Sequence, residues 1–161
     1  MPNGKLDDAD RRILSLLQLD GSLTNADLSE RVHLTPAPCY RRVKRLEKEG
    51  FIEGYRAILS RPALGLGLTI FIEIKFDGHR SENTANFQNA MRRMPEVVSC
   101  HMISGDADYL VEMVVPDLTV YHRILTETLL KLPMVKDIRS NFTLQTVKRD
   151  APLPLHYYNA R

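Results

Sequence analysis

The chain has 161 residues, of which 43% are apolar and 26% charged, and its formal net charge is +2. This length supports one compact domain or two small ones, and the composition is typical of a globular protein. The apolar runs are no longer than a strand and the N-terminus is polar, so we expect neither a membrane span nor a secretion signal. The only cysteines, Cys39 and Cys100, lie in different predicted elements, which is typical of free thiols in a reducing cytoplasm.

Two helices are expected before residue 34. The segment DDADRRILSLLQLDG predicts the first, and its acidic start favours the positive end of the helix dipole. The segment TNADLSERV predicts the second, with Thr24 as N-cap and Asp27 placed for a variant of the capping box. The residues expected to face a common core are Ile13, Leu14, Leu16, Leu17, Ala26, Leu28 and Val32.

Two prolines stand at the start of a third predicted helix, LTPAPCYRRVKRLEKEG. If Thr35 is the N-cap, Pro36 and Pro38 occupy the first and third helical positions, where a proline removes no intrahelical hydrogen bond. We expect the Thr35 hydroxyl to cap this end and Gly50 to terminate a helix over residues 36–49. The apolar spacing predicts a buried stripe of Cys39, Val43 and Leu46.

Basic charge is concentrated on this third helix. Residues 36–48 carry five positive residues and one negative, a net of +4, whereas residues 1–60 carry ten basic and nine acidic residues, a net of +1. Four of these basic residues share the face opposite the apolar stripe: Arg41, Lys44, Arg45 and Lys48. A basic helix face alone is often only a solvated surface, so its context has to decide its role.

The context is that of a winged helix-turn-helix. The short connection His33-Leu34-Thr35 joins the second helix to the basic third one, which is the helix-turn-helix arrangement. The following segment, FIEGYRAILS, has a turn at Gly54 between two short apolar runs and is expected to form the wing. Together with the first helix, these parts predict DNA binding, with each basic helix of a dimer in a major groove.

Base contacts are expected from Arg41, Lys44 and Arg45. Phosphate contacts are expected from Lys48, Arg42 and the wing residue Arg56, because such contacts position a protein on the duplex without reading its sequence. The full set of candidate DNA-binding residues is Thr35, Pro36, Ala37, Tyr40, Arg41, Arg42, Lys44, Arg45, Lys48 and Arg56.

From residue 66 the apolar pattern changes from helical to alternating. Four strands are predicted by LTIFIEIKF, VVSCHMI, YLVEMVV and VKDIRSNFTLQTVKR. Two helices are predicted by SENTANFQNAMRRM and DLTVYHRILTETLLKL. The order βαββαβ is the ferredoxin-like arrangement, one antiparallel sheet with both helices on one face. The expected fold class is therefore α+β, a winged helix-turn-helix followed by a ferredoxin-like domain.

The expected domains are a DNA-binding domain over residues 1–60, a linker over 61–66, a sheet domain over 67–150 and a tail over 151–161. The tail, APLPLHYYNAR, either lies across a neighbouring subunit or is mobile. The second face of the sheet also needs a cover, because residues 71–74 and 109–115 offer apolar side chains in both directions. A partner subunit is the simplest cover, so we expect a homodimer that assembles further into a tetramer or an octamer.

One loop of the sheet domain, Ser104-Gly105-Asp106-Ala107-Asp108-Tyr109, is a candidate for ligand chemistry. Glycine and aspartate are ordinary turn formers, so the loop has a purely structural interpretation. Alternatively it binds an amino acid: Gly105 lets the ligand carboxylate approach backbone N–H groups, and Asp106 or Asp108 accepts hydrogen bonds from the ligand ammonium. The chain has no phosphate loop, dinucleotide fingerprint or metal-ligand spacing, so we expect no cofactor and no metal.

Three segments resemble the Lrp/AsnC (leucine-responsive, or feast/famine) transcriptional regulators. They are LDDADRRIL, LTNADLSERVHLTPAPCYRRVKRLEKEGFIEGY and SGDADYLVEMVVPDLTVYHRILTETLLKLPMV, and the match runs from about Leu6 to Val147. His33 departs from the family, many of whose members have glycine there, and histidine tolerates a positive φ at some cost.

The resemblance implies that the C-terminal half binds an effector and forms oligomers, with the 104–109 loop at a cleft between subunits. The apolar residues that we place near this loop are Met102, Leu118 and Phe142. The candidate effector-binding set is Met102, Ser104, Gly105, Asp106, Asp108, Tyr109, Leu118 and Phe142.

These observations predict a cytoplasmic, nucleoid-associated regulator that binds double-stranded DNA and a free amino acid, with no membrane partner. It is expected to control genes of amino-acid metabolism. A second hypothesis is an architectural DNA-compacting protein whose C-terminal half binds no small molecule. A third, an enzyme of amino-acid metabolism, lacks a catalytic constellation once the first 60 residues are assigned to DNA binding.

Overall fold

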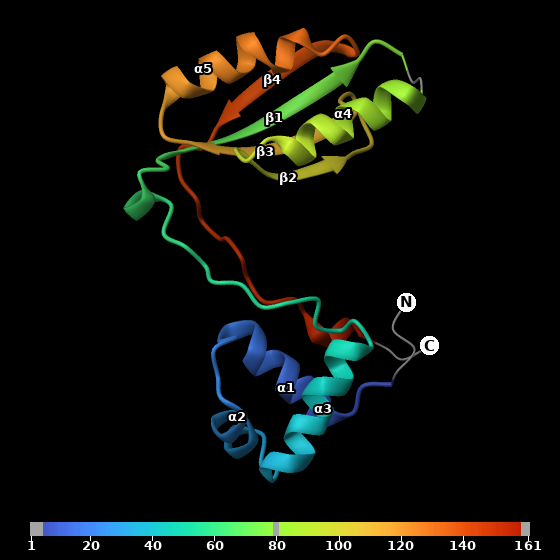
Figure 1. Ribbon diagram of the computed structural model, residues 1–161, viewed down its shortest axis with the longest axis vertical. Coiled ribbons are helices and arrows are strands. Elements are labelled where there is room, and N and C mark those ends of the chain that lie inside the picture. Colours follow the sequence, from blue (N-terminus) through green and yellow to red (C-terminus); the bar gives the residue numbers. More distant parts are fainter. Residues whose placement is uncertain (1–4, 79–80, 159–161) are drawn as a thin grey trace. The chain divides into compact units, whose positions relative to one another are not determined.

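A computed structural model describes residues 5–78 and 81–158 of the chain (Figure 1). The chain divides into two compact units, which are considered separately below. The first unit contains the chain up to Ile58 together with the segment from Lys148 onwards, and the second is Leu59–Val147. Within the described residues, no helix is both long enough and apolar enough to cross a membrane.

The first unit is built from three helices, α1 (Asp8–Leu19), α2 (Asn25–Arg31) and α3 (Pro36–Lys48). Their apolar faces meet in one small core, whose buried members are Leu6, Ile13, Leu14, Leu28, Val32, Cys39 and Leu46. Leu16, Leu17 and Val43 pack against this core while partly buried. Ala26 was expected to face inward but is exposed, and Ser29 is buried in its place with its hydroxyl donating to the Ala26 carbonyl at 2.8 Å.

The start of α3 confirms the helical positions of the two prolines but not the expected cap. Thr35 is the N-cap residue, yet its side chain makes no capping hydrogen bond. A capping hydroxyl accepts from the N–H of the second or third helical residue, and the third residue here is Pro38, which has no N–H. Rigid proline backbone therefore defines this helix start without help from the threonine hydroxyl.

The end of α3 is a Schellman motif, as the glycine position predicts. Gly50 has a φ of 77°, and its N–H donates to the Glu47 carbonyl at 3.1 Å. The Phe51 N–H donates to the Leu46 carbonyl at 2.9 Å, which completes the two-bond pattern. In the turn between α2 and α3, His33 has a φ of 57°, so it occupies the left-handed conformation that the sequence anticipated there.

The segment that was expected to form the wing contains no strand. Residues 51–60 follow α3 without regular secondary structure, and the apolar side chains of Ile58 and Leu59 are 70% and 62% exposed. A hairpin with no third strand and no apolar surface to cover it is marginally stable in water. The helix-turn-helix is therefore present in this structure without a paired wing hairpin.

The C-terminal segment belongs to the first unit, in neither of the two arrangements that the sequence left open. Leu155 and Tyr158 pack against the helical core, and the Tyr158 ring lies edge-on to Phe51 with centroids 5.7 Å apart. The Arg11 guanidinium donates to the Tyr158 carbonyl at 3.0 Å. Gln18 accepts from the Leu153 N–H at 2.7 Å and donates to its carbonyl at 3.4 Å. The segment therefore adds surface to the DNA-binding unit's own core.

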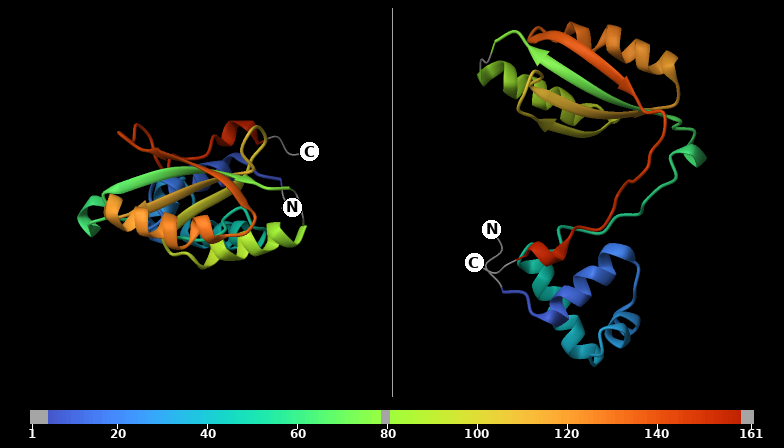
Figure 2. Two further views of the ribbon diagram at one scale, coloured as in Figure 1. Left: turned by 90° about the horizontal axis from the view of Figure 1, so that it is seen from above. Right: turned by 180° about the vertical axis from the view of Figure 1, so that it is seen from behind.

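The second unit is a four-stranded antiparallel sheet with the order β2-β3-β1-β4. Its strands are β1 (Leu68–Phe76), β2 (Val97–Met102), β3 (Tyr109–Val115) and β4 (Val135–Phe142). The helices α4 (Ser81–Arg93) and α5 (Leu118–Glu127) lie on the same face of the sheet (Figure 2). This arrangement confirms the predicted ferredoxin-like βαββαβ fold.

The core of this unit lies between the sheet and its two helices. Alternation along β1 buries Ile70, Ile72 and Ile74 completely on the helix side. An aromatic cluster closes one end, where Phe87 of α4 lies 5.1 Å from Phe76 and 4.6 Å from Tyr109, measured between ring centroids. At the start of α5, the Val120 N–H donates to the Asp117 carboxylate at 2.9 Å, which confirms the predicted cap.

The opposite face of the sheet has no helix over it, and its surface is mixed in character. Phe71 is 39% exposed there. Beside it, Glu73 accepts from Asn141 at 3.1 Å and pairs with Arg139 at 3.5 Å. The expectation of a doubly apolar sheet is therefore met only in part, because charged residues alternate with the apolar ones on this face.

Candidate DNA-binding surface and effector loop

The exposed surface of α3 contains most of the predicted DNA-binding residues. Its exposed members are Thr35, Pro36, Ala37, Tyr40, Arg41, Lys44 and Lys48. The Lys44 ammonium lies 5.7 Å from the centroid of the Tyr40 ring and 2.7 Å from the Glu47 carboxylate. The hydrogen bond from Glu47 and its charge raise the pKa of Lys44, so this side chain keeps its positive charge. Arg56 is exposed in the segment that follows.

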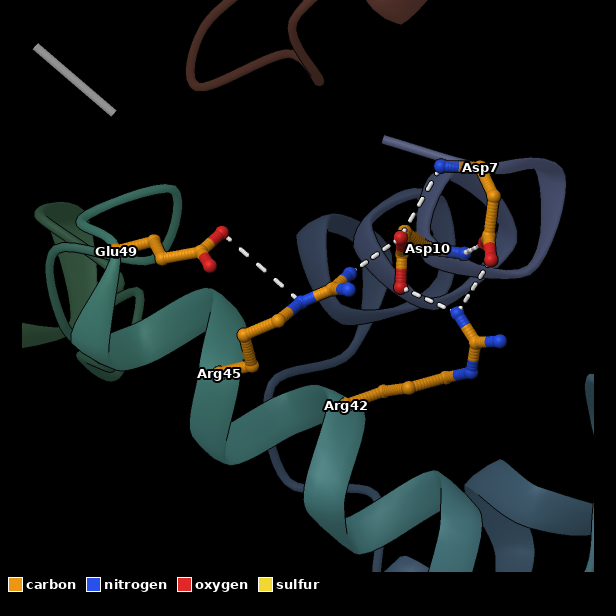
Figure 3. A network of polar contacts seen from close by, with 5 residues as sticks. All are labelled: Asp7, Asp10, Arg42, Arg45 and Glu49. Carbon is orange, nitrogen blue, oxygen red and sulfur yellow. Dashed lines mark hydrogen bonds and ion pairs between the residues drawn. The ribbon is translucent and has the colours of Figure 1, made fainter. Parts of the chain in front are cut away.

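Two of the predicted DNA-binding arginines point elsewhere (Figure 3). Arg42 donates to Asp7 at 2.6 Å and to Asp10 at 3.0 Å. Arg45 donates to Asp10 and lies 3.9 Å from Glu49. The sequence analysis assigned Arg45 to the base-reading face and Arg42 to phosphate, but in the structure carboxylates at the N-terminus of α1 engage both guanidinium groups.

The acidic start of α1 therefore has two roles. Asp7 and Asp10 form a reciprocal capping box, in which each side chain accepts from the other residue's N–H. Partial burial alone would raise the pKa of Asp7, but hydrogen bonds from Asp10 N–H and Arg42, with the charge of Arg42, lower it overall. The same pairing raises the pKa of Arg42. The sequence pattern suggested only the capping role, because it does not show which helix lies opposite.

The effector loop is closed by backbone and side-chain contacts of Asp108. Its carboxylate accepts from the Phe76 N–H at 2.7 Å, and its own N–H donates to the Ile74 carbonyl at 2.9 Å. Gly105 has a φ of 117°, a backbone conformation that favours glycine. Ser104 and Asp106 are exposed at the loop tip. Asp108 thus carries a structural load that the ligand-binding hypothesis did not assign to it.

Two cavities adjoin this loop. One, of about 420 Å³, lies between α4 and the edge strand β2 and is lined by Met102, Tyr109, Gln88 and Arg92 among others. Tyr109 is 3% exposed, and its hydroxyl accepts from the Gln88 amide at 3.0 Å. The other cavity, of about 240 Å³, is lined by charged groups and by the loop, namely Glu73, Lys75, Asp106, Ala107, Asp137 and Arg139.

Two predicted effector residues do not lie beside the loop. Leu118 and Phe142 line a third cavity of about 470 Å³. The strand register places it at the other end of the sheet, since Phe142 pairs with Ile70 while the loop follows the pairing of Tyr109 with Ile74. One protomer therefore does not bring the predicted effector residues into a single cavity. Within the described residues, no group of three or more His, Cys, Asp or Glu residues could hold a metal ion.

Comparison with known proteins agrees with this architecture. A model of the Lrp/AsnC ligand binding domain matches residues 69–153, and a model of winged helix-turn-helix DNA-binding domains matches residues 6–53. The chain belongs to the Lrp/AsnC family. The winged helix-turn-helix match ends at residue 53, close to the point where the structure loses regular secondary structure.

Relatives in the Lrp/AsnC family match along most of their length. The leucine-responsive regulatory protein of Escherichia coli K12 is 43% identical over 148 residues, which are 92% of this chain and 90% of that protein. A transcriptional regulator from Neisseria meningitidis, solved as a complex with L-Met, is 38% identical with a TM-score of 0.92, over 95% of this chain and 99% of that one. An AsnC family transcriptional regulator from Agrobacterium tumefaciens is 35% identical with a TM-score of 0.89, over 94% and 99%.

Proposed function

We propose that this Lrp/AsnC family protein is a sequence-specific transcriptional regulator that binds DNA through α3 and responds to a free amino acid. The observation that carries the proposal is the basic surface of α3. Arg41, Lys44 and Lys48 stand exposed on a helix whose opposite face supplies Cys39 and Leu46 to the core. Such a helix can enter a major groove without disturbing its own packing. Its place of action is the cytoplasm, on the nucleoid.

The charged cavity beside the loop supports an amino acid as the effector. Lys75 and Arg139 present cations there, and Asp106 presents a carboxylate on the exposed loop tip. A zwitterion offers matching groups: a carboxylate for the cations and for N–H groups near Gly105, and an ammonium for Asp106. Because Asp108 already accepts from the Phe76 N–H, we assign the ammonium contact to Asp106. The relatives named above include one described as leucine-responsive and one bound to L-Met.

A second protomer completes the proposed assembly. Leu118 and Phe142 are 59% and 42% exposed and lie away from the loop within one chain, so they can reach an effector only across a subunit contact. The helix-free face of the sheet, with Phe71 exposed, offers a surface for such a contact. A dimer would present two α3 helices to half-sites about 10 bp apart, or a multiple of that spacing.

Calorimetric titration with each amino acid, in the presence and absence of DNA selected by the protein from a random pool, tests the proposal. We expect one amino acid to bind and to change the affinity for the selected DNA. The ligand-binding domain match favours this outcome over an architectural role. Binding to DNA without sequence preference and without any amino-acid response would instead identify the protein as an architectural DNA-compacting protein.

A further inference from the structure

The five basic residues of α3 fall into two sets. Arg41, Lys44 and Lys48 are exposed, whereas Arg42 and Arg45 pair with carboxylates of α1 (Figure 3). These pairs join residues 32 to 35 positions apart in the chain, so they depend on the packing of α1 against α3. Two of the five positive charges on the helix are therefore matched within the protein.

Asp10 is the centre of this network. Its side chain is completely buried, and its Oδ1 accepts from Arg42 at 3.0 Å while its Oδ2 accepts from Arg45. Oδ2 also accepts from the Asp7 N–H at 3.1 Å. Asp7 adds a second contact to Arg42, at 2.6 Å. Both oxygens of the buried carboxylate thus have an arginine partner.

Burial does not hold the two arginines in place. Their side chains are 30% and 41% exposed, so rotation about side-chain bonds can carry either guanidinium into solvent. Arg45 also lies one helical turn from Arg41, at the edge of the exposed basic surface. A guanidinium binds carboxylate and phosphate through the same forked geometry. A DNA phosphate and the α1 carboxylates would therefore compete for the same groups.

We propose that Asp7 and Asp10 act as an internal substitute for DNA phosphate, which withholds Arg42 and Arg45 from the duplex and limits non-specific binding. The inference rests on the proposed binding of DNA through α3. Phosphate contacts add affinity for every sequence alike and make binding depend on salt. A helix with all five charges free would grip any duplex more tightly. With two of them matched, the exposed set of Arg41, Lys44 and Lys48 carries the interaction.

The decisive variant is Asp10→Asn, which removes the charge while keeping one oxygen to accept from the Asp7 N–H. Affinity for a random-sequence duplex is measured across a salt series. Each released arginine should steepen the salt slope by about one and, at 0.1 M salt, raise the affinity about eightfold. Asp10→Asn should release Arg45, and the double variant Asp7→Asn/Asp10→Asn should release Arg42 as well, for a steepening of about two.

Asp8→Asn is the matched control. Asp8 is exposed in the same first turn of α1 and carries the same charge, but the ion pairs of Arg42 and Arg45 run to Asp7, Asp10 and Glu49. Its substitution should leave the salt slope unchanged. If Asp8→Asn and Asp10→Asn steepen the slope equally, the effect is one of net charge and the inference is overturned.

Arg45→Gln supplies a test that does not require Asp10→Asn to fold. In the otherwise unchanged protein it should leave the salt slope as it is, because Arg45 is already withheld. In the Asp10→Asn background, with folding checked by circular dichroism, it should abolish the gain. A lower slope for Arg45→Gln alone would show that this arginine already contacts DNA, which contradicts the inference. If the unchanged protein binds no DNA at all, the proposed function itself fails.

Discussion

At the scale of single residues, surroundings separate side chains of the same type. Arg41 is exposed, whereas its neighbour Arg42 lies between two carboxylates. The two aspartates of the effector loop differ in the same way, because Asp108 accepts from a backbone N–H and Asp106 lies exposed at the tip. The role of each residue therefore depends on the groups that its neighbours have already engaged.

The first residue-scale prediction concerns Lys48, an exposed phosphate candidate. Lys48→Ala should weaken binding to all DNA sequences and reduce the salt slope by about one, because one phosphate contact per subunit is lost. Fluorescence anisotropy over a salt series measures both quantities. An unchanged affinity and slope would mean that α3 does not dock in the way described.

A second residue-scale prediction concerns Arg41, the exposed arginine nearest the start of the helix. Arg41→Ala should relax the sequence preference at one base position and cost about 1–3 kcal/mol on selected DNA, if the arginine reads a guanine. Binding to selected and random duplexes should be compared. Equal losses on both would assign Arg41 to the DNA backbone.

A third prediction concerns acid stability. Asp7 has a pKa below its ordinary value of 3.8 in the folded protein, so its contribution is present above that value. The contribution is lost as the pH falls through the lower folded pKa. Urea unfolding at neutral pH and at about pH 3 should therefore show a smaller acid-induced loss for Asp7→Asn than for the unchanged protein. Identical losses would show that Asp7 contributes nothing to pH dependence.

At the scale of elements, the helix starts differ in how they are stabilised. Thr24 at the start of α2 accepts from the Asp27 N–H at 3.2 Å, whereas Thr35 at the start of α3 makes no such bond. The two prolines of α3 restrict its first turn instead, which also limits the conformations of the unfolded chain.

Helix capping gives an element-scale prediction with a built-in comparison. Thr24→Ala should lower the free energy of unfolding by about 1 kcal/mol, because the second helix loses its cap. Thr35→Ala should change it by less, since no capping bond is lost. Chemical denaturation of the first unit measures both. Equal costs for the two substitutions would contradict the capping assignment.

At the scale of the whole molecule, the chain closes its first unit with its last segment. The helical core gains Leu155 and Tyr158 only after β4 has been completed. Neither unit is therefore a simple stretch of sequence, although the sheet domain of Leu59–Val147 is continuous and has its own core.

The C-terminal segment gives the molecule-scale prediction. Ending the chain at Arg149 should lower the thermal stability of the first unit, because Phe51 and the α1 side of the core lose their apolar cover. DNA binding at low temperature should persist, since no α3 surface residue is removed. Differential scanning calorimetry, with Tyr158→Ala as a milder variant, measures the loss. An unchanged melting of the first unit would show that the segment contributes no stability.

The sequence by itself determined whatever depends on near neighbours. Helices and strands follow from apolar periods of 3.6 and 2 residues, so the order of elements and the ferredoxin-like topology were predictable. The positive φ of His33, the glycine after α3 and the cap at Asp117 were also predictable, because each depends on a few adjacent residues. The position of the charged helix surface followed from the same periodicity.

Tertiary structure alone decided the contacts between distant residues. The pairing of Arg42 and Arg45 with Asp10 spans more than 30 residues, and the contact of Arg11 with Tyr158 spans 147. The distance between Phe142 and the effector loop depends on strand register in the same way. A charge or an apolar side chain carries no label for its partner, and only the packed chain brings the two within reach.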